Sequence, residues 1–430
     1  MTEIIYYPDF ELRKKILARP YAEDTATEVA VKDIINDVRR GGDKSLLRYA
    51  KILDGVNLES LLVSKKEIDD SELRVEPEVK EAINKAARNI SKFHKAQISP
   101  DTDIETTSGV RCVLRKTAID RVGLYIPGGT APLFSTVLML AIPAKIAGCK
   151  EITIFTPPSK DASVNQMILY SAKVAGVDKI VKAGGAQAIA AMAYGTESIV
   201  PCNKIFGPGN RYVSIAKQLV SKSVSIDMYA GPSELMVIAD DTANSSFVAA
   251  DLLSQAEHGE DSQVFLVTTS EDFAISCRKE VYKQLENLSR RKELEGALAK
   301  SRIVVVKTLQ EAVDIANEYA PEHLIVAATD PWDIAYKVCS AGSVFIGNYS
   351  PESAGDYASG TNHTLPTGGW ARSQGGVNID SFCRTYSIQE LTWEGLQGLA
   401  STIQTMADAE GLEAHSNAVI KRVEEQFYGN

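Results

Sequence analysis

The chain has 430 residues, of which 44% are hydrophobic and 24% are charged, an ordinary composition for a globular protein. Single hydrophobic cores stop growing at roughly 250–300 residues, so the length predicts two or more domains. With 46 basic and 56 acidic side chains the net charge is −10, which argues against a nucleic-acid-binding protein, because such proteins usually carry a basic surface.

The six cysteines are scattered and form no CxxC pair. We therefore expect reduced thiols, a cytoplasmic protein and no thiolate metal site. The N-terminus lacks a basic segment followed by an apolar one, so no signal peptide is predicted. The most apolar stretch, residues 133–149, contains Pro143 and Lys145. Because a membrane span needs roughly 20 apolar residues, we expect a buried helix there and no membrane partner.

The first hundred residues show helical spacing of apolar side chains, most clearly at residues 29–38 and 78–93. From residue 110 onward, short β-branched segments alternate with helical ones in two successive series. The expected strands are residues 122–126, 151–155, 179–181, 204–206, 234–238, 263–268, 303–306, 324–327 and 344–346. This alternation predicts an α/β fold with two Rossmann-like parallel-sheet domains and small helical N- and C-terminal extensions.

The chain has only five histidines. His94 lies in a helical pattern, where a packing or partly exposed side chain is the ordinary interpretation. The other four stand beside carboxylates, glycines or loop residues. Gln255 and His258 are three residues apart, so they share one face of a predicted helix and both could reach one metal ion. A surface pair without a ligand would have the same spacing.

Glu322 and His323 are adjacent at the start of a predicted strand. Two bases close together suit a reaction with two kinds of proton transfer, although an exposed strand start is equally compatible with the pattern.

Asp356 and His363 belong to a Gly/Ser/Thr/Asn-rich stretch, residues 353–376, that has no helical or strand period and is typical of a functional loop. Glu410 and His415 supply a further carboxylate and imidazole near the C-terminus. Oxygen and nitrogen donors without thiolate indicate Zn²⁺ or a similar divalent metal. The HExxH pattern of common metalloproteases is absent from the sequence.

Three glycine-containing turns, at residues 126–130, 183–187 and 206–210, each follow a predicted strand and open a predicted helix. Such turns direct backbone N–H groups at anions. None matches GxGxxG, and ordinary tight turns also use glycine. Three at the same edge of one sheet nevertheless favour a nucleotide site.

The chain resembles the histidinol dehydrogenase family over nearly its whole length. Nine segments in the same order carry the resemblance: RVGLYIPGGT (residues 121–130), GGAQAIA (184–190), IFGPGN (205–210), AGPSE (230–234), LSQAEH (253–258), APEHL (320–324), SGTNH (359–363), LPTG (365–368) and EGL (410–412), the last followed by His415.

The resemblance implies oxidation of L-histidinol through L-histidinal to L-histidine with two NAD⁺, the terminal step of histidine biosynthesis, in a homodimer whose subunits share their active sites. By motif, the implied catalytic pair is Glu322 and His323, and the implied Zn²⁺ ligands are Gln255, His258, Asp356 and His415. The implied substrate contacts are Ser233, His363 and Glu410, together with Gln255, His258, His323, Asp356 and His415. The implied NAD contacts are Tyr125, Gln187 and Asn210.

We expect the domains to divide as follows: residues 1–24 a helical extension, 25–121 and 233–376 a catalytic α/β domain, 122–232 an NAD-binding domain, and 377–430 a helical dimerisation tail. Three other functions remain open from the sequence. They are a hydrolase that uses Zn²⁺-activated water, a non-enzymatic binding protein on the same scaffold, and a dehydrogenase of another amino alcohol.

Overall fold

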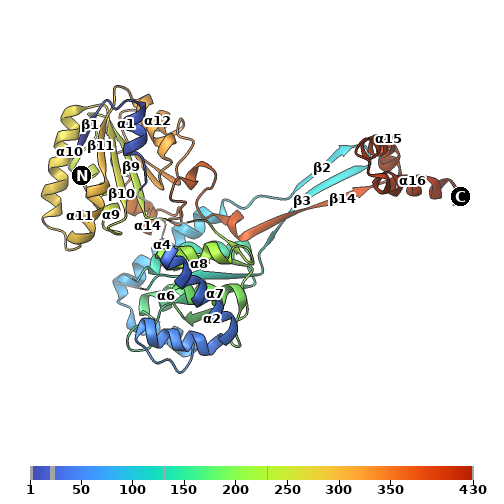
Figure 1. Ribbon diagram of the computed structural model, residues 1–430, viewed down its shortest axis with the longest axis horizontal. Coiled ribbons are helices and arrows are strands. Elements are labelled where there is room, and N and C mark those ends of the chain that lie inside the picture. Colours follow the sequence, from blue (N-terminus) through green and yellow to red (C-terminus); the bar gives the residue numbers. More distant parts are fainter. Residues whose placement is uncertain (1–2, 20–24, 129–131, 230, 429–430) are drawn as a thin grey trace. The chain divides into compact units, whose positions relative to one another are not determined.

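The computed structural model describes residues 3–19, 25–128, 132–229 and 231–428. Gly129, Thr130 and Ala230, which belong to two of the segments above, lie outside the described residues. The chain divides into two compact units, Met1–Gln97 with Ile119–Phe382, and Ile98–Ala118 with Cys383–Asn430 (Figure 1). Among the described residues, no helix is both long enough and apolar enough to cross a membrane.

The first unit contains two parallel sheets, of which the larger has six strands within the described residues. In spatial order they are β1 (Ile4–Tyr6), β11 (Arg302–Val305), β10 (Gln263–Thr268), β9 (Glu234–Ala239), β12 (His323–Ala327) and β13 (Ser343–Ile346). The central strands are apolar at nearly every position because helices cover both faces of the sheet.

Alternate side chains of the central strand β9 enter two different cores. Leu235 and Val237 pack under one set of helices, α9 (Ser245–Ala256), α10 (Glu271–Leu285) and α11 (Arg291–Lys300). Met236 and Ile238 pack under the other set, α1 (Phe10–Ile16), α12 (Leu309–Tyr319) and α13 (Pro331–Ala335). Figure 1 shows α10 and α12 on opposite sides of this sheet.

The second parallel sheet has five strands in the part of the chain that the structure describes. Their spatial order is β6 (Lys179–Lys182), β5 (Glu151–Thr156), β4 (Arg121–Tyr125), β7 (Lys204–Phe206) and β8 (Ser225–Ile226). One core joins it to α4 (Pro77–Lys95), α5 (Phe134–Ala147) and α6 (Gln166–Ala175). The opposite core joins it to α2 (Thr25–Tyr49), α7 (Gly185–Tyr194) and α8 (Arg211–Val220).

The alternating series is confirmed, since every strand expected in it forms within one or two residues of its expected bounds, and the apolar stretch at 133–149 is the buried helix α5. The grouping of the N-terminal residues differs from the expected one. Strand β1 pairs with β11, so residues Ile4–Tyr6 of the expected N-terminal extension belong to the six-stranded sheet. Helices α2, α3 (Lys65–Arg74) and α4 pack on α7, α6 and α5, which belong to the five-stranded sheet.

The second unit contains an antiparallel sheet, β14 (Cys383–Leu391), β3 (Val110–Ala118) and β2 (Thr102–Thr107), followed by helices α15 (Trp393–Ala409) and α16 (Glu413–Tyr428). The expectation that the tail is helical is therefore wrong for residues 383–391, which form the strand β14. Eight of its nine residues are exposed. Because neither face of the strand is buried, its sequence does not need the alternation of apolar and polar residues by which a strand is predicted.

Three short helices precede β14: α14 (Glu352–Tyr357), η2 (Trp370–Arg372) and η3 (Ile379–Phe382). Helix α14 corrects the expectation of an irregular loop from residue 353. In addition, α2 continues into a short π-helix, η1 (Ala50–Asp54).

Candidate active site

The adjacent residues Glu322 and His323 lie at the amino end of strand β12. Parallel pairing sets His323 opposite Leu235 of β9, so the amino ends of these two central strands meet. The Glu322 carboxylate accepts a hydrogen bond from the backbone N–H of Glu234 at 3.0 Å. His323 Nδ1 lies 3.7 Å from Glu322 Oε2. Both side chains are buried, with 8% and 4% exposure.

Burial and neighbouring charges shift the pKa values of both members of this pair. Burial raises the pKa of Glu322 to about 7, against the opposing effect of the neighbouring His323. For His323, burial alone would lower the pKa, but the carboxylates of Glu322, Asp356 and Glu352 outweigh burial and raise it to about 9. At 3.7 Å the imidazole and the carboxylate do not share a hydrogen bond, and the raised pKa of His323 favours its protonated form.

Three of the four expected metal ligands converge beside this pair. Gln255 lies in the last turn of α9, and its amide Nε2 donates to Glu322 at 3.3 Å, while its Oε1 is buried without a hydrogen-bond partner among the described residues. His258 follows two residues beyond the helix. Asp356 comes from α14, and its Oδ1 lies 3.7 Å from His323 Nε2. Gln255, His258 and Asp356 thus lie close to Glu322 and His323 in the same unit.

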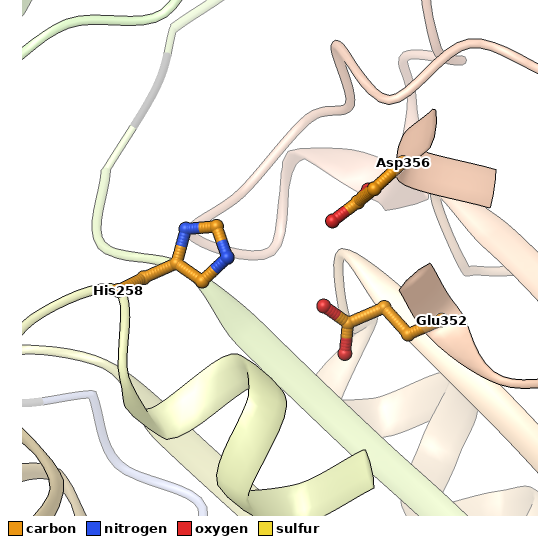
Figure 2. A group of neighbouring side chains, drawn as sticks. All are labelled: His258, Glu352 and Asp356. Atoms are coloured by element: carbon orange, nitrogen blue, oxygen red, sulfur yellow. The ribbon is translucent and has the colours of Figure 1, made fainter. Parts of the chain in front are cut away.

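Glu352, which the sequence did not single out, belongs to the same group. Its carboxylate lies beside the His258 imidazole and the Asp356 carboxylate, and one potential ligand atom from each lies within 4.8 Å of the others (Figure 2). Glu352 and Asp356 are four residues apart on α14 and so share a face of that helix. The spacing is present in the sequence, but it carries meaning only if residues 352–357 are helical.

The expected substrate contacts Ser233 and His363 also reach this region. Ser233 directly precedes β9 and is half-buried. His363 Nδ1 lies 3.0 Å from the backbone oxygen of Asp356, and its Nε2 lies 3.1 Å from the hydroxyl of Thr136 on α5. His363 therefore connects the backbone of Asp356 to α5, a helix that packs on the five-stranded sheet. Burial lowers its pKa, which favours a neutral ring.

Glu410 and His415 lie in the second unit, Glu410 at the end of α15 and His415 in the first turn of α16. Both are exposed. The first unit by itself therefore supplies neither of these two expected residues.

The three expected NAD contacts lie at the carboxyl ends of strands in the five-stranded sheet. Tyr125 ends β4, and its hydroxyl accepts a hydrogen bond from the N–H of Gly185 at 3.0 Å. Gln187 lies in the first turn of α7, 3% exposed, with an Oε1 that has no partner in the described parts of the chain. Asn210 caps the N-terminus of α8 by accepting from the N–H of Val213 at 3.2 Å.

The third glycine turn approaches the first so closely that only glycine fits. Gly207 has φ +119, and a Cβ there would lie 2.2 Å from the backbone oxygen of Tyr125. The turns after β4, β6 and β7 are thus gathered at one sheet edge, which is where open α/β sheets bind ligands. The expected acid–base pair, Glu322 and His323, departs from that rule, since it lies at the amino end of its own strand.

His94, the fifth histidine, packs in the interior. It is fully buried on α4, and its Nδ1 lies 2.8 Å from the backbone oxygen of Ile90. This agrees with the structural role expected for it.

Comparison with known proteins gives a consistent result. Residues 17–423 match the family model described as histidinol dehydrogenase. A histidinol dehydrogenase of Bacteroides fragilis is 54% identical over 424 residues, covering 98% of this chain and 99% of the relative. One from Campylobacter jejuni is 48% identical over 429 residues, with the same coverage. The crystal structure of histidinol dehydrogenase from Elizabethkingia anophelis superposes with a TM-score of 0.96 at 48% identity, covering 99% of this chain and 98% of the other.

Proposed function

Since the chain belongs to the histidinol dehydrogenase family, whose reaction is the terminal step of histidine biosynthesis, we propose that it uses Zn²⁺ and NAD⁺ to oxidise L-histidinol through L-histidinal to L-histidine. The observation that carries this proposal is the buried Glu322–His323 pair, which lies beside a group of nitrogen and oxygen metal donors.

The donor set fits a divalent cation. Gln255 has a buried amide oxygen without a described partner, and leaving such an atom unsatisfied costs about 1–3 kcal/mol. A cation held there would satisfy it. Gln255, His258 and Asp356 would hold Zn²⁺ together with His415 from a second subunit. Bound Zn²⁺ would supply positive charge and a fixed template on which the amino and imidazole nitrogens of the substrate are oriented.

His323 is suited to accept the alcohol proton when hydride leaves in the first oxidation. An imidazole must be neutral to do this, and the surrounding carboxylates raise the His323 pKa to about 9. With Zn²⁺ held at Asp356, the negative charge of that carboxylate would be offset. The pKa of His323 would then return toward its ordinary value near ~6.5, where His323 can accept a proton at neutral pH.

Glu322 is suited to the second oxidation, in which the aldehyde must gain water before a second hydride can leave. Burial raises its pKa to about 7, close to the working pH at which a general base is most effective. Its contact with the Glu234 N–H at 3.0 Å fixes the carboxylate on one side. His323 beside it can then return or accept the accompanying proton.

NAD⁺, which accepts the hydride in each oxidation, would lie against Tyr125, Gln187 and Asn210 at the edge of the five-stranded sheet. The unpartnered Oε1 of Gln187 supports this placement, because a buried acceptor in the first turn of α7 needs a donor from a ligand or water. Ser233, His363 and Glu410 would contact the substrate. We place the enzyme in the cytoplasm as a homodimer in which Glu410 and His415 complete the site of the partner.

Replacing His323 tests the proposal directly. His323→Asn should reduce the rate of NADH formation from L-histidinol about 10²–10⁴-fold, the usual contribution of a general base. Zn²⁺ content and NADH binding should be retained, because His323 is in neither binding set. A variant that keeps more than half of the wild-type rate would refute the assigned role.

A further inference from the structure

Glu352 occupies an unusual position for a carboxylate that has no assigned role. Its side chain is completely buried at the start of α14, and neither carboxylate oxygen has a hydrogen-bond partner among the described residues. A charged group without a partner is one of the costliest things to bury, so such groups are normally paired or coordinated to a metal. Both of its oxygens are thus available to a ligand.

The surroundings of Glu352 identify the class of ligand. Ligand atoms of Glu352, His258 and Asp356 all lie within 4.8 Å of one another, and Figure 2 shows the imidazole and both carboxylates facing a common point. Donors bound to one Zn²⁺ at about 2.1 Å stand roughly 3.4 Å apart. Small side-chain movements would therefore bring all three onto one ion.

All three of these donors belong to the first unit. The ligand His415 of the proposed function lies in the second unit and would come from the other subunit. The set built around Glu352 therefore lies wholly within a single chain, whereas the set with His415 does not.

We propose that Glu352 is an additional metal ligand, with which His258 and Asp356 hold the divalent cation in a single chain, so that metal uptake does not require a donor from a second subunit. This rests on the proposed function in that the same cation is afterwards shared with His415. Glu352 is then the donor that retains the ion while the intersubunit ligand is absent.

The test compares metal affinity, and not activity, in four full-length proteins: wild type, Glu352→Gln, His415→Ala and the double variant. Each is stripped with a chelator and titrated with Co²⁺ against a chelating dye, and bound Co²⁺ is followed by its visible absorption. We expect His415→Ala to bind Co²⁺ still, more weakly than wild type. The double variant should bind at least ~10-fold more weakly than His415→Ala, since even partners outside the metal's direct contacts change affinity 10–100-fold.

Glu257→Gln in the His415→Ala background is the matched control. Glu257 adjoins His258 in sequence but is not part of the group of three ligand atoms, so its removal should leave the affinity of His415→Ala unchanged. The metal-free Glu352→Gln protein should melt no lower than metal-free wild type, because a neutral amide costs less to bury than a carboxylate.

Equal Co²⁺ affinities for His415→Ala and the double variant would overturn the role of Glu352 and leave the proposed function intact. The role of Glu352 as a metal ligand also fails if Glu352→Gln changes only histidinol binding, which would make Glu352 a substrate contact. If wild type itself takes up no Co²⁺, both proposals fail. If His415→Ala binds Co²⁺ as tightly as wild type, only the role of His415 is lost.

Discussion

At the scale of single residues, Glu322 and His323 are neighbours in sequence to which the proposed function gives different tasks. Both side chains are buried, and His323 Nδ1 lies 3.7 Å from Glu322 Oε2. Only the Glu322 carboxylate is held by a backbone N–H, that of Glu234 on the adjacent strand β9. The fixed carboxylate suits activation of a water molecule, whereas the imidazole suits transfer of a proton to and from the substrate oxygen.

This division predicts unequal effects on the two oxidations. Glu322→Gln should slow oxidation of L-histidinal about 10²–10⁴-fold and affect the first hydride transfer from L-histidinol much less. Stopped-flow NADH absorbance with each substrate separates the two steps. Equal losses in both half-reactions would remove the separate role of Glu322.

The burial of the Asp54 carboxyl at the end of η1 predicts that the stability of the fold depends on pH, independently of the proposed metal. Its Oδ2 is buried without a partner among the described residues, and burial raises its pKa to about 6, compared with roughly 3.9 in an unfolded chain. A raised pKa favours the folded state at low pH, and this stability is lost as the pH rises from about 4 through about 6.

Asp54→Asn should therefore be more stable than wild type by about 1 kcal/mol at pH 8, after allowance for the partial exposure of the group. The advantage should vanish below about pH 4. Denaturant unfolding at both pH values measures it, with Asp241→Asn, at an exposed position, as the control. An advantage that persists unchanged at pH 4 would contradict the assignment.

The sequence predicted most residues of the candidate site but not Glu352. His258 and Asp356 stand near glycine and other histidines, in contexts typical of ligands. Glu352 follows a proline in a stretch rich in small polar residues. His258, which lies beside it in the structure, is far from it in the sequence. Only the fold brings the two together, so no local pattern could predict that contact.

At the scale of elements, a buried ion pair supports the carboxyl edge of the five-stranded sheet, where the proposed function places NAD⁺. Lys217 of α8 pairs with Asp227, which follows β8, and both side chains are almost fully buried. Lys217 also donates to the backbone oxygen of Gly207 at 3.0 Å, and Asp227 accepts from the N–H of Gly207 at 2.7 Å. The pair thus holds the Gly207 turn against Tyr125.

Breaking this pair should be costly. Lys217→Met leaves the Asp227 charge buried and unpaired, so we expect a loss of about 3–5 kcal/mol in the free energy of unfolding and weaker NAD⁺ binding. Lys217→Met with Asp227→Asn should recover part of the stability. Lys222→Met, at an exposed lysine just beyond α8, is the control. A loss below about 1 kcal/mol in Lys217→Met, no more than an exposed pair contributes, would show that the pair is dispensable.

Elements buried on both faces were predictable from the sequence, because their apolar runs are bounded by glycine and polar residues. The strands β2 and β14 were not. All six residues of β2 and eight of the nine in β14 are exposed, so their strand conformation comes from pairing with β3 and not from burial of one face.

At the scale of the whole molecule, the proposed site needs residues from both compact units: Glu322 and His323 belong to the first, and Glu410 and His415 belong to the second. The packing of α2, α3 and α4 on the five-stranded sheet was not predictable, because the periodicity of a helix shows which face is buried but not against which sheet it packs. The assignment of Glu410 and His415 to the site of the partner predicts complementation between inactive variants.

Glu322→Gln and His415→Ala homodimers should each be nearly inactive. If the subunits are mixed under conditions that allow exchange, half of the dimers become mixed, and each of these contains one site with both native residues. Activity should rise to roughly a quarter of the wild-type value at full exchange. Mixing Glu322→Gln with His323→Asn, which impair the same site, should restore nothing. No recovery in the first mixture would place His415 in the site of its own chain.

Under the proposed function, one metal-dependent site carries out both oxidations. The most direct measurement is the number of NADH molecules formed per L-histidinol consumed, with limiting substrate and excess NAD⁺, before and after chelation and again after Zn²⁺ is restored. We expect two NADH per L-histidinol, loss of activity on chelation and recovery with Zn²⁺. One NADH per substrate with release of the aldehyde, or full activity in the stripped enzyme, would contradict this claim.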